Sequence, residues 1–162
     1  MAREALRWPI VAMASAKWFP RECHNCHTVC AIVFKPVEQD RCLRNHIGEN
    51  EEVIHNIVAN PQFKKVLREV KQHWRSGVVD NMFKLVIWCK SGRHRSVALA
   101  AITKYILTRE GCEVATNTHL NQKDWYKTWK LCKGIDCPPC TNLTDRKLQA
   151  FKVAYDMWKT LG

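Results

Sequence analysis

The part of the chain that most constrains its fold runs from residue 83 to residue 107. A β-rich run, F-K-L-V-I-W-C, ends at Cys89, and the basic loop C-K-S-G-R-H-R-S follows, in which Gly92 permits a tight turn. The largely apolar residues 96–107 then predict a central helix. Backbone N–H groups in such a loop point inward, and the helix N-terminus adds partial positive charge. The segment therefore predicts a strand, a phosphate-binding loop and a helix.

The side chains of this loop suit a phosphate ligand. Arg95 can grip two phosphate oxygens through its forked guanidinium, and Lys90, Arg93 and His94 supply further donors. The alternative is a basic turn with a buried cysteine at the end of a strand. The strand, turn, charge and helix signals agree, and we favour the phosphate site.

The rest of the chain indicates one α/β domain covering residues 1–162. The sheet should be small, mixed or parallel, with helices packed on it and the strand–phosphate loop–helix unit at its centre. Strands are expected at residues 8–16, 29–37, 83–89 and 112–116, and a loop at residues 39–50. Helices are expected from Asn60-Pro61 to Ser76-Gly77, at residues 96–107, at residues 123–131 and from Thr144 onward.

Two of these helices have a clear amphipathic pattern. In the first, the residues expected to face inward are Phe63, Val66, Leu67, Val70 and Trp74, and the basic outer face holds Lys64, Lys65, Arg68, Lys71 and Arg75. In the last, the inward set is Leu148, Phe151, Ala154, Trp158 and Leu161, and the outward set is Lys147, Lys152 and Lys159.

The charge balance points to anionic partners. The chain has 26 Lys and Arg against 15 Asp and Glu, a formal net charge of +11. Such a field attracts phosphorylated metabolites or nucleic acid, and RNA is one predicted partner. Solvated basic faces without a partner are the alternative. No apolar run is long enough to span a bilayer, so no membrane partner is expected.

Nine cysteines indicate metal sites or free thiols in a reducing, intracellular and cytoplasmic setting. Their odd number excludes complete internal pairing. Cys137-x-x-Cys140 has the spacing of a metal knuckle, and Cys132, Cys112 or His119 could complete a tetrahedral zinc site. A turn with incidental thiols is the alternative.

A second group, Cys23-His-Asn-Cys26-His27, formally matches the c-type haem attachment pattern. Chance in a cysteine-rich chain explains it better, and a contribution to a zinc site is the next interpretation. The remaining histidines, His46, His55 and His73, have no partner pattern.

The central motif resembles a known family. Trp88-Cys-Lys-Ser-Gly-Arg-His-Arg-Ser-Val97 is similar to Gly-Cys-Thr-Gly-Gly-x-His-Arg-Ser-Val of the C-terminal domain family of RapZ, the RNase adapter protein. Residues 40–45 (D-R-C-L-R-N) and 112–120 (C-E-V-A-T-N-T-H-L) are similar to two further family stretches, in the same order. The resemblance spans about residues 8–121. Residues 122–162 diverge from it and comprise a cysteine-containing segment and the C-terminal helix.

In that family the domain binds an amino-sugar phosphate, contacts regulatory RNA and has no established phosphatase reaction. The resemblance therefore implies a regulatory domain that binds a phosphorylated small molecule such as a sugar phosphate. It implies an anion pocket lined by Lys90, Ser91, Gly92, Arg93, His94, Arg95 and Ser96, with Arg41, Asn45 and His119 from neighbouring loops.

The same loop also resembles that of cysteine-dependent protein tyrosine phosphatases, through Cys89-x-x-Gly92-x-x-Arg95-Ser96. By that resemblance Cys89 would be the nucleophile, Arg95 the phosphate clamp and Ser96 the residue that assists the departing thiolate. Those enzymes usually carry a His where Trp88 stands, and they need an aspartic general acid in a setting that this chain does not offer. We therefore favour a binding domain over an enzyme and keep a basic RNA-binding module as a third hypothesis. The ligand and the oligomeric state stay open.

Overall fold

The computed structural model describes residues 7–8, 10–13, 27–37, 40–77, 83–90, 93–114, 118–119, 132 and 137–162, although the side chains of residues 7–13 and 118–119 are outside the description. Its centre is a parallel sheet in the order β3-β4-β2-β6. The strands are β2 (Ile10–Met13), β3 (His27–Cys30), β4 (Leu85–Trp88) and β6 (Thr118–His119). A separate parallel pair joins β1 (Arg7–Trp8) to β5 (Glu113–Val114). The predicted α/β class is confirmed.

Strand β4 precedes the predicted phosphate loop and lies inside the sheet. It pairs with β2 on one side, where Ile10 faces Leu85, and with β3 on the other, where His27 faces Leu85. The side chains of Leu85, Val86 and Ile87 are all buried. A continuous apolar run of this kind is typical of a parallel strand covered on both faces.

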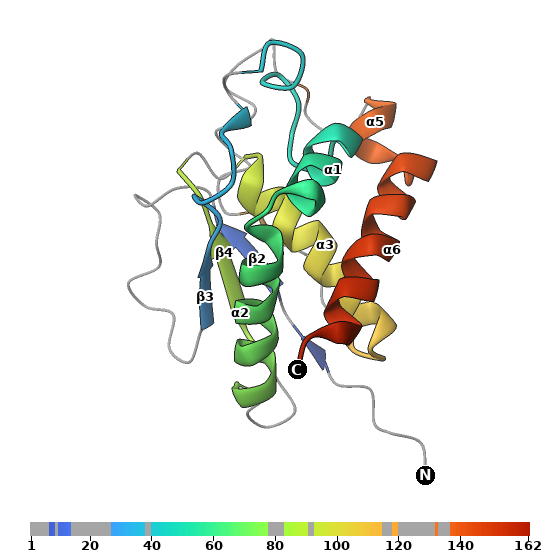
Figure 1. The fold of residues 1–162 in the computed structure, drawn as a ribbon. Coiled ribbons are helices and arrows are strands. Elements are labelled where there is room, and N and C mark those ends of the chain that lie inside the picture. The colour runs from blue at the N-terminus through green and yellow to red at the C-terminus, as the bar shows by residue number, and fades with distance from the viewer. Residues whose placement is uncertain are drawn as a thin grey trace.

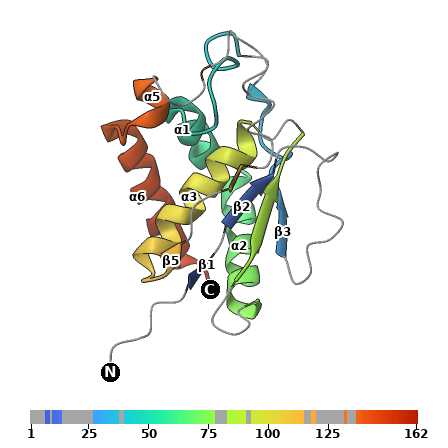
Figure 2. The ribbon, with the colours of Figure 1, turned by 180° about the vertical axis from the view of Figure 1, so that it is seen from behind.

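The helices gather beside the strands, and α1, α3, α5 and α6 lie together on one side of β2, β3 and β4 (Figures 1 and 2). Helix α3 packs against β2 and β4, α2 packs against β3, and α1 packs against α3 and α6. Buried residues of α6 share one apolar core with those of β3, β4 and α3. The bounds are Glu51–Ala59 for α1, Phe63–Ser76 for α2, Arg95–Arg109 for α3, Pro138–Thr141 for α5 and Asp145–Thr160 for α6.

The prediction of a strand over residues 29–37 was wrong in its bounds. Strand β3 ends at Cys30, which pairs with Trp88, the last residue of β4. Residues after Ala31 turn away because the partner strand has ended, and the N–H of Phe34 donates to the Ala31 carbonyl. Of the other predicted strands, 83–89 is seen as β4, and parts of 8–16 and 112–116 appear as β1, β2 and β5. The helix predicted at residues 123–131 lies outside the described residues.

Helix α1 was not predicted, although its signals are present in the sequence. The Asn50 side chain caps it by accepting a hydrogen bond from the N–H of Glu52 at 2.9 Å. Glu51 and Glu52 occupy the first turn, where negative charge favours a helix. Its buried residues are Val53, Ile54, Ile57 and Val58. Their spacing is that of an amphipathic helix, which covers the core between α3 and α6.

Two lysines predicted to face outward are buried. The Lys71 ammonium donates to the carbonyls of Trp158 and Leu161 at 2.6 and 2.8 Å. The Lys147 ammonium donates to the Cys140 carbonyl at 2.7 Å. Helix ends leave carbonyls unsatisfied and carry partial negative charge, so a buried lysine can be stabilised there. The other predicted outward residues, Lys64, Lys65, Arg68, Arg75, Lys152 and Lys159, are exposed.

The cap predicted for the last helix is confirmed, because the Thr144 hydroxyl accepts from the N–H of Lys147 at 3.2 Å. Within the described residues, no helix has the length and apolar character needed to cross a membrane.

Candidate functional site

The predicted phosphate loop, residues 89–96, follows the carboxyl end of β4 and leads into α3. This is the edge of a parallel sheet at which α/β proteins usually bind ligands. Helix α3 begins at Arg95 with His94 as its N-cap; no side chain caps it, and its first turn has no acidic residue. The N-terminal N–H groups of α3 thus lie in a setting that favours an anion. Ser91 and Gly92 lie outside the described residues.

Cys89 and Ser96 meet at the base of the loop. Both residues are fully buried, and the Cys89 thiol donates to the Ser96 hydroxyl over 3.3 Å. The contact joins the end of β4 to the first turn of α3. A thiol that is buried and acts as a donor is well placed to hold the loop together, and poorly placed to meet a substrate.

Arg95 fastens the start of α3 to the turn that follows β3. Its side chain is 3% exposed, and Nη1 donates to the carbonyls of Ile32 and Phe34, each at 3.1 Å. Its Nε–H is also buried and has no hydrogen-bond partner among the described residues. One nitrogen of the expected phosphate clamp is therefore used by the protein itself.

The other predicted ligand residues are spread around this edge. Lys90 is exposed, Arg93 is half-buried and His94 is buried. Arg41 and Asn45 are exposed on the segment before α1. His119 is in β6 opposite Ala12 of β2, and its side chain is outside the description.

The segment before α1 touches the phosphate loop through Gly48. Its N–H donates to the carbonyl of Arg93 at 2.7 Å. A Cβ at this position would lie 2.0 Å from the His94 carbonyl oxygen and 2.6 Å from the amide nitrogen of Ala98. Only glycine allows such a close approach, and the backbones of the two segments are therefore in direct contact.

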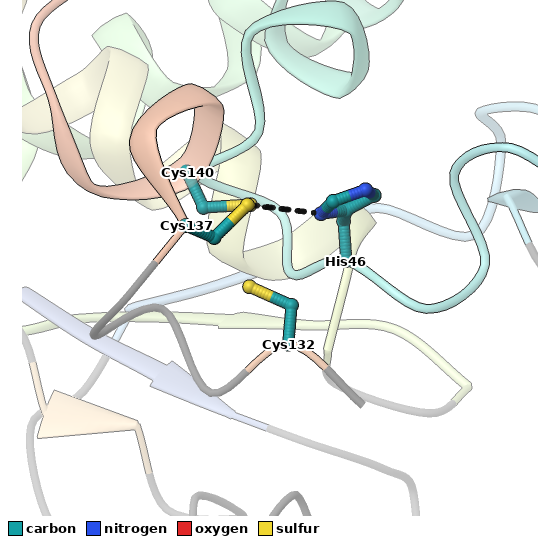
Figure 3. Close-up of side chains that lie close together, drawn as sticks. All are labelled: His46, Cys132, Cys137 and Cys140. Carbon is teal, nitrogen blue, oxygen red and sulfur yellow. Dashed lines mark hydrogen bonds between the residues drawn. The ribbon is translucent and has the colours of Figure 1, made fainter. Parts of the chain in front are cut away.

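A second group of functional side chains comprises His46, Cys132, Cys137 and Cys140, called here the His–Cys cluster (Figure 3). Their four candidate ligand atoms all lie within 4.8 Å of one another. His46 Nδ1 is 3.4 Å from the sulfur of Cys137 and 3.4 Å from that of Cys140. Tetrahedral zinc with ordinary bond lengths would separate a sulfur and a nitrogen by about 3.6 Å. The cluster could hold a metal ion.

The surroundings of Cys140 bear on its charge. Burial raises the pKa of this thiol from 9.0 to about 12, although hydrogen bonds from the Ile47 backbone and the Asn50 side chain act in the opposite direction. The Asn50 amide lies 3.6 Å from the sulfur. A thiolate at this position therefore needs a cation, and a metal ion would supply that charge.

Sequence reasoning found three members of the cluster and missed the fourth. Cys132, Cys137 and Cys140 were predicted ligands, whereas His46 was not, because nothing near it in the sequence marks it. Cys112, one predicted fourth ligand, is buried beyond the end of α3 and is not in the cluster. The second cysteine group, Cys23 to His27, lies largely outside the described residues.

The fold and site define an α/β domain with a strand–loop–helix unit, β4 to α3, beside a cysteine-rich cluster. The comparisons agree with that class: a family model described as the RapZ C-terminal domain matches residues 25–123. The match covers more than half of the 162 residues, and the chain belongs to the RapZ C-terminal domain family. No curated protein and no solved structure matched at the significance required.

Proposed function

We propose that this domain binds a phosphorylated small molecule, such as a sugar phosphate, at the phosphate loop and serves a regulatory role. The observation that carries the proposal is the N-terminus of α3, which has no side-chain cap and no acidic residue in its first turn. Lys90, Arg93 and His94 surround this end with groups that can carry positive charge. Phosphate groups bind readily where helix N–H groups and positive side chains converge.

The residues assigned to the ligand are those of the loop and its neighbours. Ser91, Gly92 and Ser96 are assigned to the ligand from the sequence motif alone. The Arg95 Nε–H, which has no partner among the described residues, supports its role as a donor. Arg41, Asn45 and His119 would contact the rest of the ligand.

A thermal-shift titration with inorganic phosphate and sugar phosphates tests the proposal. The wild type should be stabilised, and Lys90→Gln should weaken binding about tenfold through loss of one charged contact. Lys84→Gln is the matched control, because Lys84 is equally an exposed lysine but stands at the opposite end of β4. Equal loss in both variants, or no stabilisation of the wild type, would reject a specific site.

Phosphatase activity is the second candidate, favoured by the hydrogen bond between Cys89 and Ser96. Against it stand the full burial of Cys89 and the use of Arg95 Nη1 by two carbonyls. We expect no hydrolysis of an aryl phosphate. Turnover that disappears in Cys89→Ser would establish the enzyme instead.

RNA binding is the third candidate, favoured by the exposed basic residues Lys64, Lys65 and Arg68 on α2. Phosphate contacts by such residues make RNA affinity fall steeply with salt. If the domain binds RNA there, neutralising all three should abolish salt-dependent retention of RNA. Retention unchanged by the triple substitution would exclude this face.

For the His–Cys cluster we propose zinc as the metal. Three cysteines and one histidine are a common ligand set of structural zinc sites. Zinc bound to three thiolates and a neutral imidazole would carry one net negative charge, which the buried Lys147 ammonium, bonded to the Cys140 carbonyl, would offset.

A further inference from the structure

Among the described residues, the segment that carries the three cysteines, Cys132 and residues 137–141, has only the short helix α5 as regular structure of its own. Helix α5 has four residues, and a single helical turn is not stable in isolation. The buried residues of its small apolar cluster are Ile47, Val97 and Cys140, with Cys132 and Cys137 partly buried against them. Three thiols and an imidazole converge with little apolar surface to bury. A bound metal would add stabilisation here, because its binding free energy contributes to folding.

The 45–48 turn lies between the His–Cys cluster and the phosphate loop. On one side, His46 belongs to the cluster, and the Asn45 carbonyl accepts from the N–H of Cys132 at 2.7 Å. On the other side, Gly48 contacts Arg93 and His94 without room for a side chain. The turn therefore touches both sites within four residues.

A second contact joins the two sites through side chains. Val97, in the first turn of α3, is fully buried in the small apolar cluster with Ile47 and Cys140. Close-packed contacts of this kind transmit a displacement with little loss, because the interior has few voids to absorb it. Movement of Cys140 or of the 45–48 turn would reach the N-terminal turn of α3.

We propose that a zinc ion bound by His46, Cys132, Cys137 and Cys140 is a structural clamp that presses the 45–48 turn against the first turn of α3. The ligand set is complete at four, which leaves no open position and indicates a structural site. On binding, the three thiols release their protons to solvent and the neutral imidazole donates the lone pair of Nδ1. Removing the metal loosens the start of α3 and, resting on the proposed function, weakens anion binding there.

The first test of the proposed zinc clamp is the metal content of the protein. The full chain, stripped by a chelator under reducing conditions and reloaded, should take up one zinc, and cobalt should give the thiolate charge-transfer bands of a tetrahedral site. Cys137→Ser should lower metal affinity at least about tenfold. The exposed Cys42, four residues from His46, is the matched control, and Cys42→Ser should have no effect.

The assignment of His46 has its own control. His46→Gln should weaken the metal and change the cobalt spectrum, whereas His55→Gln, also half-buried but outside the cluster, should change neither. No metal uptake by the wild type, or equal effects of the cluster and control variants, would overturn the site.

Hydrogen exchange tests the coupling without any ligand. On zinc removal, amides of residues 93–100 should exchange at least about tenfold faster, whereas those of α2 should not change. If stripping the zinc speeds exchange both at residues 93–100 and in α2, the same two regions are compared between the wild type and Cys137→Ser. Faster exchange in both regions of that variant would overturn a local clamp. Unchanged exchange at residues 93–100 in a protein that binds zinc would also overturn it.

Phosphate titration then separates the two proposals. Stripping zinc should weaken the affinity for inorganic phosphate by about tenfold. If the zinc-loaded protein binds no phosphate ligand while the exchange effect is present, the proposed function fails and the clamp stands. If phosphate binds equally with and without zinc, the regulation of the anion site is overturned.

Discussion

The phosphate loop and the His–Cys cluster are built in opposite ways. The predicted phosphate loop is one contiguous stretch of eight residues, which runs from the end of β4 into the first turn of α3. The cluster takes His46 from the segment before α1 and its cysteines from residues 132–140, at the other end of the domain. Chain connectivity alone brings the loop residues together, whereas the cluster depends on the whole fold. A site made of adjacent residues can be recognised in the sequence, whereas a site that the fold assembles from distant residues can be recognised only in part.

The two sites also differ in what supports them. Hydrogen bonds from Cys89 and Arg95 hold the first turn of α3 to the end of β4 and to the turn after β3. The cluster is supported by a four-residue helix, a small apolar contact and a few hydrogen bonds to Cys132 and Cys140. We therefore expect the loop to keep its shape without a ligand and the cluster to depend on its metal.

The largest loss of stability is expected at Gly48, where the segment that carries His46 contacts the phosphate loop. Gly48→Ala should lower the free energy of unfolding by about 3 kcal/mol, because the new methyl group would overlap the backbone of His94 and Ala98. Gly162→Ala is the control, since no atom lies within 4 Å of the added carbon. Urea unfolding of both variants measures the difference. Similar midpoints would contradict the close approach of Gly48 to the backbone of His94 and Ala98.

A smaller loss of stability is expected from a substitution within the phosphate loop. Arg95→Leu should cost about 2 kcal/mol, because the carbonyls of Ile32 and Phe34 would lose a charged donor. Lys90→Gln, which removes an exposed charge from the same loop, should leave the stability within about 0.5 kcal/mol of wild type. Equal effects on thermal unfolding would argue against a structural role for Arg95.

A substitution at Asn50 tests the support of the His–Cys cluster. Asn50→Ala removes the cap of α1 and the donor to the Cys140 sulfur, and should cost about 1 kcal/mol of stability. It should also lower zinc affinity about tenfold. Asn60→Ala removes a side-chain acceptor for the N–H of Gln62, away from the cluster, and serves as the control. A competition assay with a zinc chelator should show no change in that variant.

The smallest expected change in stability comes from a substitution at Glu49. Burial raises the pKa of its carboxyl group, although Lys147 and Lys104 act in the opposite direction. A raised pKa means that the folded state favours the neutral acid, so ionisation costs stability as the pH rises above about 4.5. Glu49→Gln should therefore raise stability slightly at pH 7, and the gain should disappear near pH 4. Thermal unfolding at both pH values measures it; a gain that persists at pH 4 would point to another cause.

Much of the fold could be predicted because its signals are local. The apolar run of β4, the glycine-containing loop and the apolar helix after it share one stretch, and their order fixes the unit. The apolar spacing and the Thr144 cap were sufficient for α6. These predictions succeed because each element carries its own periodicity and its own end signals.

The errors share a physical cause, which is that the deciding contact lies far away in sequence. Strand β3 stops where β4 ends, and a single run of β-rich residues does not show that limit. Lys71 is buried because the carbonyls of Trp158 and Leu161 happen to lie beside it. His46 joins the cluster in the same way. Helix α1 is different, since its cap and its apolar spacing are both local signals in the sequence.

The central position of β2 has a consequence for how the chain folds. Residues 10–13 pair with β4 and β6, whose sequences lie far downstream. About 75 residues separate the end of β2 from the end of β4. At synthesis rates of about 5–20 residues per second, the ribosome needs roughly 4 to 15 s to make them. Throughout that interval the nascent strand has both edges open. The domain is therefore expected to be most prone to aggregation while it is still on the ribosome.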